Sequence, residues 1–215
     1  MTKPSSRQLN LFGPDVDLGA GSAPPRRRPP RDRDENRYFF AFRPPVDVTH
    51  SIDIFGRGLC RSLGSRSRLL GPSRYHITLC GIKGQGEAPA WIIAALKAIG
   101  GSVSAPIFDI AFDHARGYGR PGEPRAVFLA STQKISVLDD FYGRLRDAMQ
   151  ANGFRTNSGF NPHLTMFYDE HPVTNAIAPP VCFTVRDLVL IRSIYGASHH
   201  DHLARWPLRD RADVV

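Results

Sequence analysis

The 215-residue chain is predicted to fold as a two-lobed α+β domain, and three observations predict it. A strand-like run, an amphipathic helix, a polar loop and an apolar strand follow one another in residues 37–82. The same order returns, with nearly the same spacing, in residues 124–168. Each copy ends in a strand that begins His-x-Thr, at His76 and at His163. This repetition implies two similar lobes related by a pseudo-twofold axis.

The first half begins with "RYFFAF", a strand-like run that "RPP" ends. A helix is predicted next, because apolar residues recur at helical spacing at Val48, Ile52, Phe55, Leu59 and Leu63. The basic loop "SRSRLLGPSR" leads into the apolar strand "YHITLCGI". "APAWIIAALKAIG" predicts a second helix, and "APIFDIAFDHA" predicts a strand.

The second half begins with the strand "PRAVFLAS". A helix follows, with Gly153 as its C-terminal stop and one apolar face formed by Ile135, Leu138, Phe141, Leu145 and Met149. "FRTNSGFNP" then loops into the strand "HLTMFY". "VCFTVRDLVLIRS" predicts one long strand or two short ones before the closing "HLARWPL".

Residues 1–36 are predicted to be a disordered tail rich in Pro and Arg, and residues 37–215 a single two-lobed domain. One apolar island, Gln8–Phe12 ("QLNLF"), interrupts the tail. It resembles the QLxLF peptide by which bacterial proteins dock on the replicative sliding clamp. The preferred interpretation is a strap that lies on its own domain, with clamp docking as the alternative.

Composition narrows the class of protein without identifying it. The net charge is +8, of which residues 1–37 contribute +3, so the body is basic in its own right and suits polyanionic partners. No apolar run has the length of a membrane span, and no secretory signal is visible. The three cysteines, Cys60, Cys80 and Cys182, are interpreted as reduced core residues. We therefore expect a cytoplasmic protein, and a monomer.

The repeated motif would place two polar side chains on one face of each strand. Side chains alternate along a strand, so His76 and Thr78 would point to one side, as would His163 and Thr165. Facing copies would bring two imidazoles and two hydroxyls into one small space. A lone His-x-Thr in an apolar strand would usually be structural, and it is the duplication that favours a shared site.

Such a space suits phosphoryl chemistry without a metal or other cofactor. Imidazole titrates near neutrality, so one ring can accept a proton while the other donates one. The threonine hydroxyls can donate hydrogen bonds to phosphate oxygens, on which charge grows in the transition state. The residues therefore predict metal-free acid–base cleavage of a phosphodiester.

The paired motifs resemble the signature of the 2H phosphoesterase superfamily, which has two His-x-Thr/Ser motifs, and its LigT-like branch in particular. The branch includes bacterial 2′-5′ RNA ligases and RNA 2′,3′-cyclic phosphodiesterases. The resemblance runs from "RYFFAFRPP" to "RWPL". It implies two antiparallel sheets that line a central groove, with the helices outside.

The resemblance also implies roles for the motif residues. His76 would protonate the departing 3′ oxygen of a 2′,3′-cyclic phosphate, and His163 would activate water, which leaves a 2′-phosphate. Thr78 and Thr165 would hold the phosphate. The reverse reaction would be ATP-independent 2′-5′ ligation. The loop "LLGPSRY" lacks the family's usual acidic residue before the first histidine, and the linker "GYGRPGEPR" is unusually rich in Gly and Pro.

Further residues are candidates for binding RNA or a cyclic nucleotide. Arginines near the first motif and the middle linker would contact phosphates, chiefly Arg74, Arg120 and Arg125. Tyr118, Phe160 and Tyr168 would stack on a base, although core packing is the preferred interpretation for Phe160 and Tyr168.

Two alternatives remain open. "SHHDH", residues 198–202, contains residue types that bind metals but is expected to lie in a turn, where adjacent residues chelate one ion poorly. The other alternative to an enzyme is an RNA- or nucleotide-binding module of the same fold that performs no useful chemistry.

Overall fold

The computed structural model describes residues 35–85, 87–120, 122–156, 159–194 and 199–209. The Pro/Arg-rich tail, with Gln8–Phe12, lies almost entirely outside the described residues. Its disorder and its docking therefore stay predictions. Within the described residues, no helix is long and apolar enough to cross a membrane.

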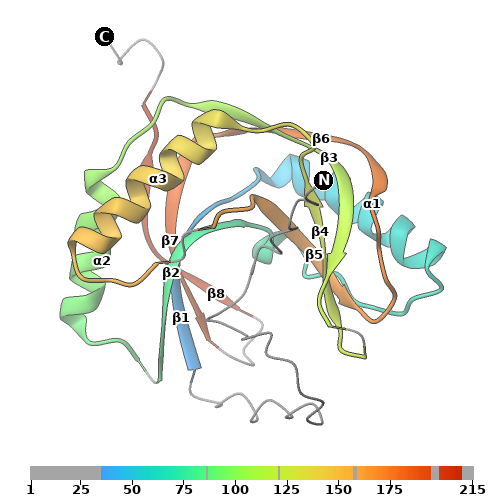
Figure 1. Cartoon of the computed structure of the whole chain (residues 1–215), viewed down its shortest axis with the longest axis horizontal. Coiled ribbons are helices and arrows are strands. Elements are labelled where there is room, and N and C mark those ends of the chain that lie inside the picture. Colours follow the sequence, from blue (N-terminus) through green and yellow to red (C-terminus); the bar gives the residue numbers. More distant parts are fainter. Residues whose placement is uncertain (1–34, 86, 121, 157–158, 195–198, 210–215) are drawn as a thin grey trace, which may run out of the picture.

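Four elements and a short 3₁₀ turn form the first half of the fold (Figure 1). They are β1 (Glu35–Phe42), α1 (Val46–Ser62), the turn Pro72–Arg74, β2 (Ile77–Gln85) and α2 (Ala90–Ser102). The second half comprises β3 (Phe108–Tyr118), β4 (Arg125–Ala130), α3 (Ser136–Ala151), β5 (His163–Asp169), β6 (Ala176–Val185), β7 (Asp187–Ile194) and β8 (His200–Pro207).

The predicted strand–helix–strand repeat is present. Of the two alternatives for the run at residues 181–193, the structure has two strands, because β6 and β7 are separated at Arg186. The expected turn at "SHHDH" is wrong, since His200, Asp201 and His202 begin β8. The first residues of β8 are polar, so the sequence lacks the apolar alternation that would predict a strand here.

The strands form an antiparallel sheet in the order β6-β3-β4-β5-β2-β1-β7-β8. This order divides into two halves: lobe 1 contains β2, β1, β7 and β8, and lobe 2 contains β5, β4, β3 and β6. A single residue pair, Ile77 with Leu164, joins β2 to β5. The two expected sheets are thus one sheet in hydrogen bonding, linked only at the centre, where the two motif strands meet.

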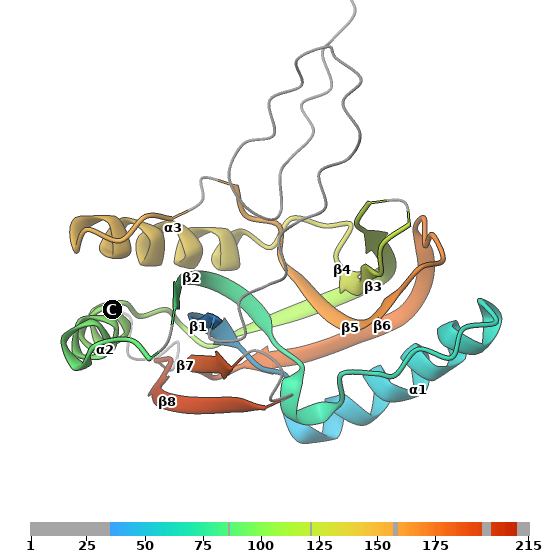
Figure 2. The same ribbon diagram turned by 90° about the horizontal axis from the view of Figure 1, so that it is seen from below.

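The helices cross between the lobes. Helix α1, which connects two strands of lobe 1, packs against β5 and β6 of lobe 2. Helix α3, which connects two strands of lobe 2, packs against β2, and α2 packs against α3, β7 and β8. Figures 1 and 2 both show α1 at one end of the molecule, with α2 and α3 at the other. This reciprocal arrangement is what a pseudo-twofold axis between the lobes requires.

One hydrophobic core extends through both lobes. In α1, Thr49, Ile52, Gly56 and Cys60 are buried at three- and four-residue intervals, which is the spacing of one helical face. Cys60 and Cys80 are buried, as predicted, but Cys182 is exposed on β6, so its assignment to the core is wrong. The apolar neighbours of Cys182 in sequence point to the core, whereas its own position in the strand alternates outward.

Candidate active site

Burial alternates along the two motif strands as expected. Ile77 and Leu79 are buried, whereas Thr78 is exposed and His76 is half-buried. In β5, Leu164 and Met166 are fully buried, whereas His163 and Thr165 are half-buried. All four polar side chains therefore lie on the face of the sheet opposite the main core. We call this face the histidine face.

The single pair between the lobes brings the two motifs together. Ile77 lies opposite Leu164 in an antiparallel pair. The same register places His76 across from Thr165, and Thr78 across from His163. The two histidines then occupy diagonal positions, which lie about 7–8 Å apart in a regular sheet. Such a separation leaves room for one phosphate between the rings.

Both imidazoles are oriented by the same local contact. The Nδ1 atom of His76 lies 2.7 Å from the carbonyl oxygen of Arg74, and Nδ1 of His163 lies 2.7 Å from the carbonyl oxygen of Asn161. A carbonyl oxygen only accepts hydrogen bonds, so each Nδ1 carries the proton and donates it. The Nε2 atom of each neutral ring is consequently left with a lone pair, ready to accept or return a proton.

Each histidine ring also packs on a phenylalanine of the neighbouring strand. The ring centroids of His76 and Phe39 are 5.0 Å apart, and those of His163 and Phe128 are 4.9 Å apart. Phe39 belongs to an apolar cluster of lobe 1 and Phe128 to one of lobe 2. These small clusters lie on the histidine face, apart from the main core, and provide a rigid floor for the two rings.

Burial and nearby charge both affect the protonation of the histidines. Burial lowers the pKa of His76 to about 3, and the positive charges of His200, His163 and Arg43 act in the same direction. Burial also lowers the pKa of His163, although its hydrogen bond to the Asn161 carbonyl opposes this effect. Without a ligand, the protein thus favours neutral imidazoles at both positions.

Two buried contacts hold the motif strands in place. The Tyr75 hydroxyl donates a 2.5 Å hydrogen bond to Asp53 on α1, which fixes the residue before His76. At the end of β5, Asp169 is 3% exposed and accepts hydrogen bonds from the Ser65 and Ser67 hydroxyls. Burial alone would raise the pKa of Asp169, but these hydrogen bonds hold it well below its usual range.

Two of the predicted stacking residues share the histidine face. Tyr118 of β3 and Tyr168 of β5 both lie opposite Ala126 of β4, one on each side of it. They are 41% and 51% exposed, so core packing is the wrong interpretation for Tyr168. Two strand spacings separate the tyrosines by about 10 Å. Both tyrosines therefore offer exposed aromatic surface on this face, with the buried Ala126 between them.

The other predicted binding residues divide between positions at the site and positions away from it. Arg74 lies two residues before His76, and its Nε atom is buried without a hydrogen-bond partner among the described residues. Arg125 lies about 16 Å along β4 from Ala130, the residue opposite His163, and its Nε donates to the carbonyl of Arg120. The ring of Phe160 stacks on Tyr142 of α3 at 4.2 Å. Arg120, Arg125 and Phe160 are therefore not brought to the histidines.

Sequence reasoning missed several residues near His76. The ring of His200 lies 5.1 Å from that of His76, and an Arg43 Nη1 lies 3.2 Å from His202 Nε2. On lobe 2, Arg116, one of the arginines that the sequence places beside the middle linker as phosphate contacts, lies opposite Phe128 on the histidine face and is exposed. Histidines at alternate positions, 200 and 202, are typical of one face of a strand. We expected a turn at these residues and therefore did not place them on a strand.

The geometry of β8 also bears on the metal alternative. His200 and His202 lie on the histidine face, whereas Asp201 alternates to the other side. There Asp201 accepts hydrogen bonds from Arg192 and pairs with His199 at 2.7 Å. Among the described residues, no group of three or more His, Cys, Asp or Glu could hold a metal ion. The potential ligands of "SHHDH" thus do not converge.

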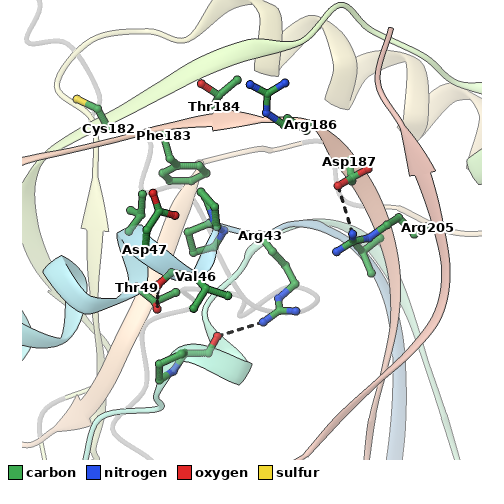
Figure 3. A pocket seen from close by; sticks show the side chains of 15 residues that line it. Arg43, Val46, Asp47, Thr49, Cys182, Phe183, Thr184, Arg186, Asp187 and Arg205 are labelled. Atoms are coloured by element: carbon green, nitrogen blue, oxygen red, sulfur yellow. Dashed lines mark hydrogen bonds and ion pairs between the residues drawn. The ribbon is translucent and has the colours of Figure 1, made fainter.

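A cavity of about 650 Å³ borders this region (Figure 3). Its lining comes from the start of α1, the end of β6, β7 and β8, and it includes Arg43, Phe183, Val189 and Arg205. Arg43 also donates from Nη2 to the Pro72 and Ser73 carbonyls, just before the first motif. One arginine therefore connects the cavity with the loop that leads into His76.

A symmetric antiparallel sheet, with a His-x-Thr strand from each half at its centre, defines a two-histidine phosphoesterase fold. Residues 61–196 match the family model described as the 2′-5′ RNA ligase superfamily, and the chain belongs to this superfamily.

Individual relatives agree with this assignment. The chain is 28% identical over 178 residues to the Escherichia coli (strain K12) RNA 2′,3′-cyclic phosphodiesterase, covering 80% of this chain and 96% of that protein. The crystal structure of E. coli LigT with 3′-AMP superposes with a TM-score of 0.66 at 24% identity, over 82% of this chain and 99% of that one. The structure of TT0787 from Thermus thermophilus gives a TM-score of 0.59 at 21% identity, over 81% and 99%. Both superpositions show the shared fold.

Proposed function

We propose that the protein is a metal-independent phosphodiesterase that hydrolyses RNA or nucleotide 2′,3′-cyclic phosphates to 2′-phosphates. The observation that carries the proposal is the matched pair of imidazoles. Both rings are anchored through Nδ1 to a backbone carbonyl two residues earlier, and both motifs meet at the one pair between the lobes. The name of the E. coli relative, RNA 2′,3′-cyclic phosphodiesterase, supports the same reaction.

The diagonal arrangement suits displacement at phosphorus. Nε2 of His163 would take a proton from water as its oxygen attacks the phosphorus. As the bond from phosphorus to O3′ breaks, His76, protonated at Nε2, would donate that proton to O3′. Thr78 and Thr165 would donate hydrogen bonds to the non-bridging oxygens. With a 5′-hydroxyl in place of water, the same steps would form a bond from O5′ to phosphorus as O3′ leaves, which would give 2′-5′ ligation without ATP.

The charge distribution links catalysis to substrate binding. His76 must be protonated to act as the acid, yet burial and nearby positive charges lower its pKa to about 3 in the unliganded protein. A bound phosphate anion favours the protonated form of a neighbouring imidazole. We infer that the substrate itself supplies the charge that places the proton on His76.

Tyr118 and Tyr168 are the proposed base-binding residues. They flank Ala126 about 10 Å along β5 from Thr165, a distance that a nucleoside attached to the bound phosphate can span. Base stacking on aromatic side chains tolerates any base. We therefore expect little discrimination among the four terminal bases.

The decisive experiment uses His76→Asn and His163→Asn with a panel of nucleoside 2′,3′-cyclic phosphates in the presence of EDTA. Each substitution is expected to lower kcat by at least about 10²-fold, because each removes one proton-transfer group. His50→Asn, an exposed position on α1, serves as the control and should retain wild-type turnover. Circular dichroism would establish that all variants fold.

The alternative function is an RNA- or nucleotide-binding module without useful chemistry. Binding of cyclic nucleotides by the wild-type protein, without turnover of any of them, would favour that module. Loss of wild-type activity in EDTA would instead exclude the metal-free mechanism.

A further inference from the structure

A group of cationic side chains lies beside His76 on the histidine face of lobe 1. We call Arg43, Arg74, His200 and His202 the cationic cluster. The sheet register places it: His202 lies opposite Ile191 and His200 opposite Ser193, so both point to the same face as Phe39. The His200 ring lies 5.1 Å from that of His76 and 5.8 Å from that of Phe39.

The cationic cluster has no carboxylate partner within the described residues. Arg43 contacts His202 and the carbonyls of Pro72 and Ser73, none of which is an anion. The nearby Asp201 is already engaged by Arg192 and His199. Two arginines without a carboxylate partner among the residues described, beside two imidazoles that can donate hydrogen bonds, indicate a place where an external anion binds.

One member of the cluster carries a direct sign of a missing partner. The Nε atom of Arg74 is buried and makes no hydrogen bond within the described part of the chain. A buried donor without an acceptor is costly and rare in native proteins. The positive charges of Arg74, Arg43 and His202 also act on His200, whose pKa burial lowers to about 4. A phosphate would satisfy the donor and relieve this repulsion.

The cluster occupies one side of the pseudo-twofold axis and leads away from the histidines. Its members come from the end of β1, the turn before β2 and the start of β8, all on the side of lobe 1. Arg43 is shared with the cavity of about 650 Å³ in Figure 3, which is large enough for a further nucleoside. Arg43 therefore borders both the cluster beside His76 and a space that suits the next part of an extended substrate.

We propose that the cationic cluster is a second phosphate subsite, which binds the phosphate on the 5′ side of the nucleotide whose cyclic phosphate lies between His76 and His163. This proposal rests on the proposed function and specifies its substrate class. The preferred substrates are then RNA ends, or cyclic nucleotides with a 5′-phosphate, and cyclic mononucleosides without a second phosphate are poorer. Arg74 and His202 would donate hydrogen bonds to the phosphate oxygens, and His200 would lie between the two phosphates.

The test compares adenosine 2′,3′-cyclic phosphate with the same compound carrying a 5′-phosphate. For the wild-type protein, the 5′-phosphate is expected to lower KM about tenfold, with little change in kcat, because it adds charge-assisted hydrogen bonds remote from the reacting phosphorus. His202→Gln and Arg74→Gln should each lose most of this preference, because KM for the 5′-phosphorylated substrate should rise toward KM for the plain substrate. His199→Gln, on the same segment but paired with Asp201, should keep the full preference.

Two results would overturn the subsite. One is equal KM values for the two substrates in the wild-type protein. The other is an equal fall of kcat for both substrates in the variants, which would indicate that the cluster only positions His76. Neither result would affect the proposed hydrolysis.

Absence of turnover would reject the proposed function, and binding then decides the subsite. Titration calorimetry would compare adenosine 2′,5′-bisphosphate with adenosine 2′-phosphate. Tighter binding of the bisphosphate, lost in His202→Gln, supports the subsite. Equal binding of the two ligands overturns it.

Discussion

At the residue scale, the site depends on how each imidazole is held. Both Nδ1 atoms donate to a carbonyl of the preceding loop, so the tautomer is set by the backbone and does not need a carboxylate partner. The two rings are equivalent in this respect. Burial lowers the pKa of both rings, and at His76 the charges of His200 and Arg43 lower it further. A bound anion would raise the pKa of His76 again.

The roles of acid and base can be separated by changing the leaving group. A p-nitrophenyl phosphodiester releases a weakly basic phenolate, which does not require protonation as it departs. The factor by which His76→Asn lowers kcat should therefore be at least about tenfold smaller for this substrate than for a 2′,3′-cyclic phosphate. His163→Asn should lose similar factors on both, because water still needs its base. Steady-state kinetics measures all four values, and the opposite pattern would exchange the two roles.

At the element scale, β8 combines structural and functional positions by simple alternation. Its histidine face carries His200, His202 and Arg205, while Trp206 turns inward against α2. A Cβ atom at Gly100 of α2 would lie only 2.4 Å from the Trp206 ring. The absence of a side chain at Gly100 therefore allows the helix to approach the strand that carries part of the cationic cluster.

Substitution of this glycine should destabilise the protein. Gly100→Ala is expected to lower the free energy of unfolding by about 1–3 kcal/mol, because the helix and the indole must move apart. Gly143→Ala is the matched control on α3, where a Cβ would meet nothing within 4 Å. It should raise the free energy of unfolding by about 0.5–1 kcal/mol through helix propensity alone. Urea denaturation measures both, and equal effects would contradict the close approach.

The sequence predicted the parts of the fold that have a local pattern. The two His-x-Thr strands, the amphipathic faces of α1 and α3 and the repeated element order are all visible in short windows. The cationic cluster was not predictable in this way, because Arg43, Arg74 and His200 converge through the pairing of β1 with β7 and of β7 with β8. Strand β8 itself has too many polar residues to show an apolar alternation, so its register could only come from the folded sheet.

At the scale of the whole molecule, the two lobes share one core. Helix α1 follows a strand of lobe 1 but packs on β5 and β6 of lobe 2, and α3 packs on β2 in return. The aromatic ring of Phe42 on β1 contacts those of Phe108 on β3 and Phe141 on α3, at 5.6 and 5.1 Å. Neither lobe buries its apolar face without the other, so we expect the domain to unfold as one unit.

A substitution on α1 tests this expectation. Ile52→Ala removes a fully buried side chain and should lower the free energy of unfolding by about 2–5 kcal/mol. Native-state hydrogen exchange should show the same loss of protection in β1 and in β4. Ile54→Ala, at a position 58% exposed on the same helix, should have little effect. Loss of protection confined to β5 and β6 would show that the lobes open independently.

The crossing of α1 has a consequence for synthesis on the ribosome. The apolar side of this helix emerges roughly a hundred residues before the strands that will cover it. During translation, the first half of the chain therefore exposes the apolar face of α1 before β5 and β6 are available to cover it. Such a nascent chain would depend on chaperones, or on slow elongation, until the later strands arrive, and a truncated product would be prone to aggregate.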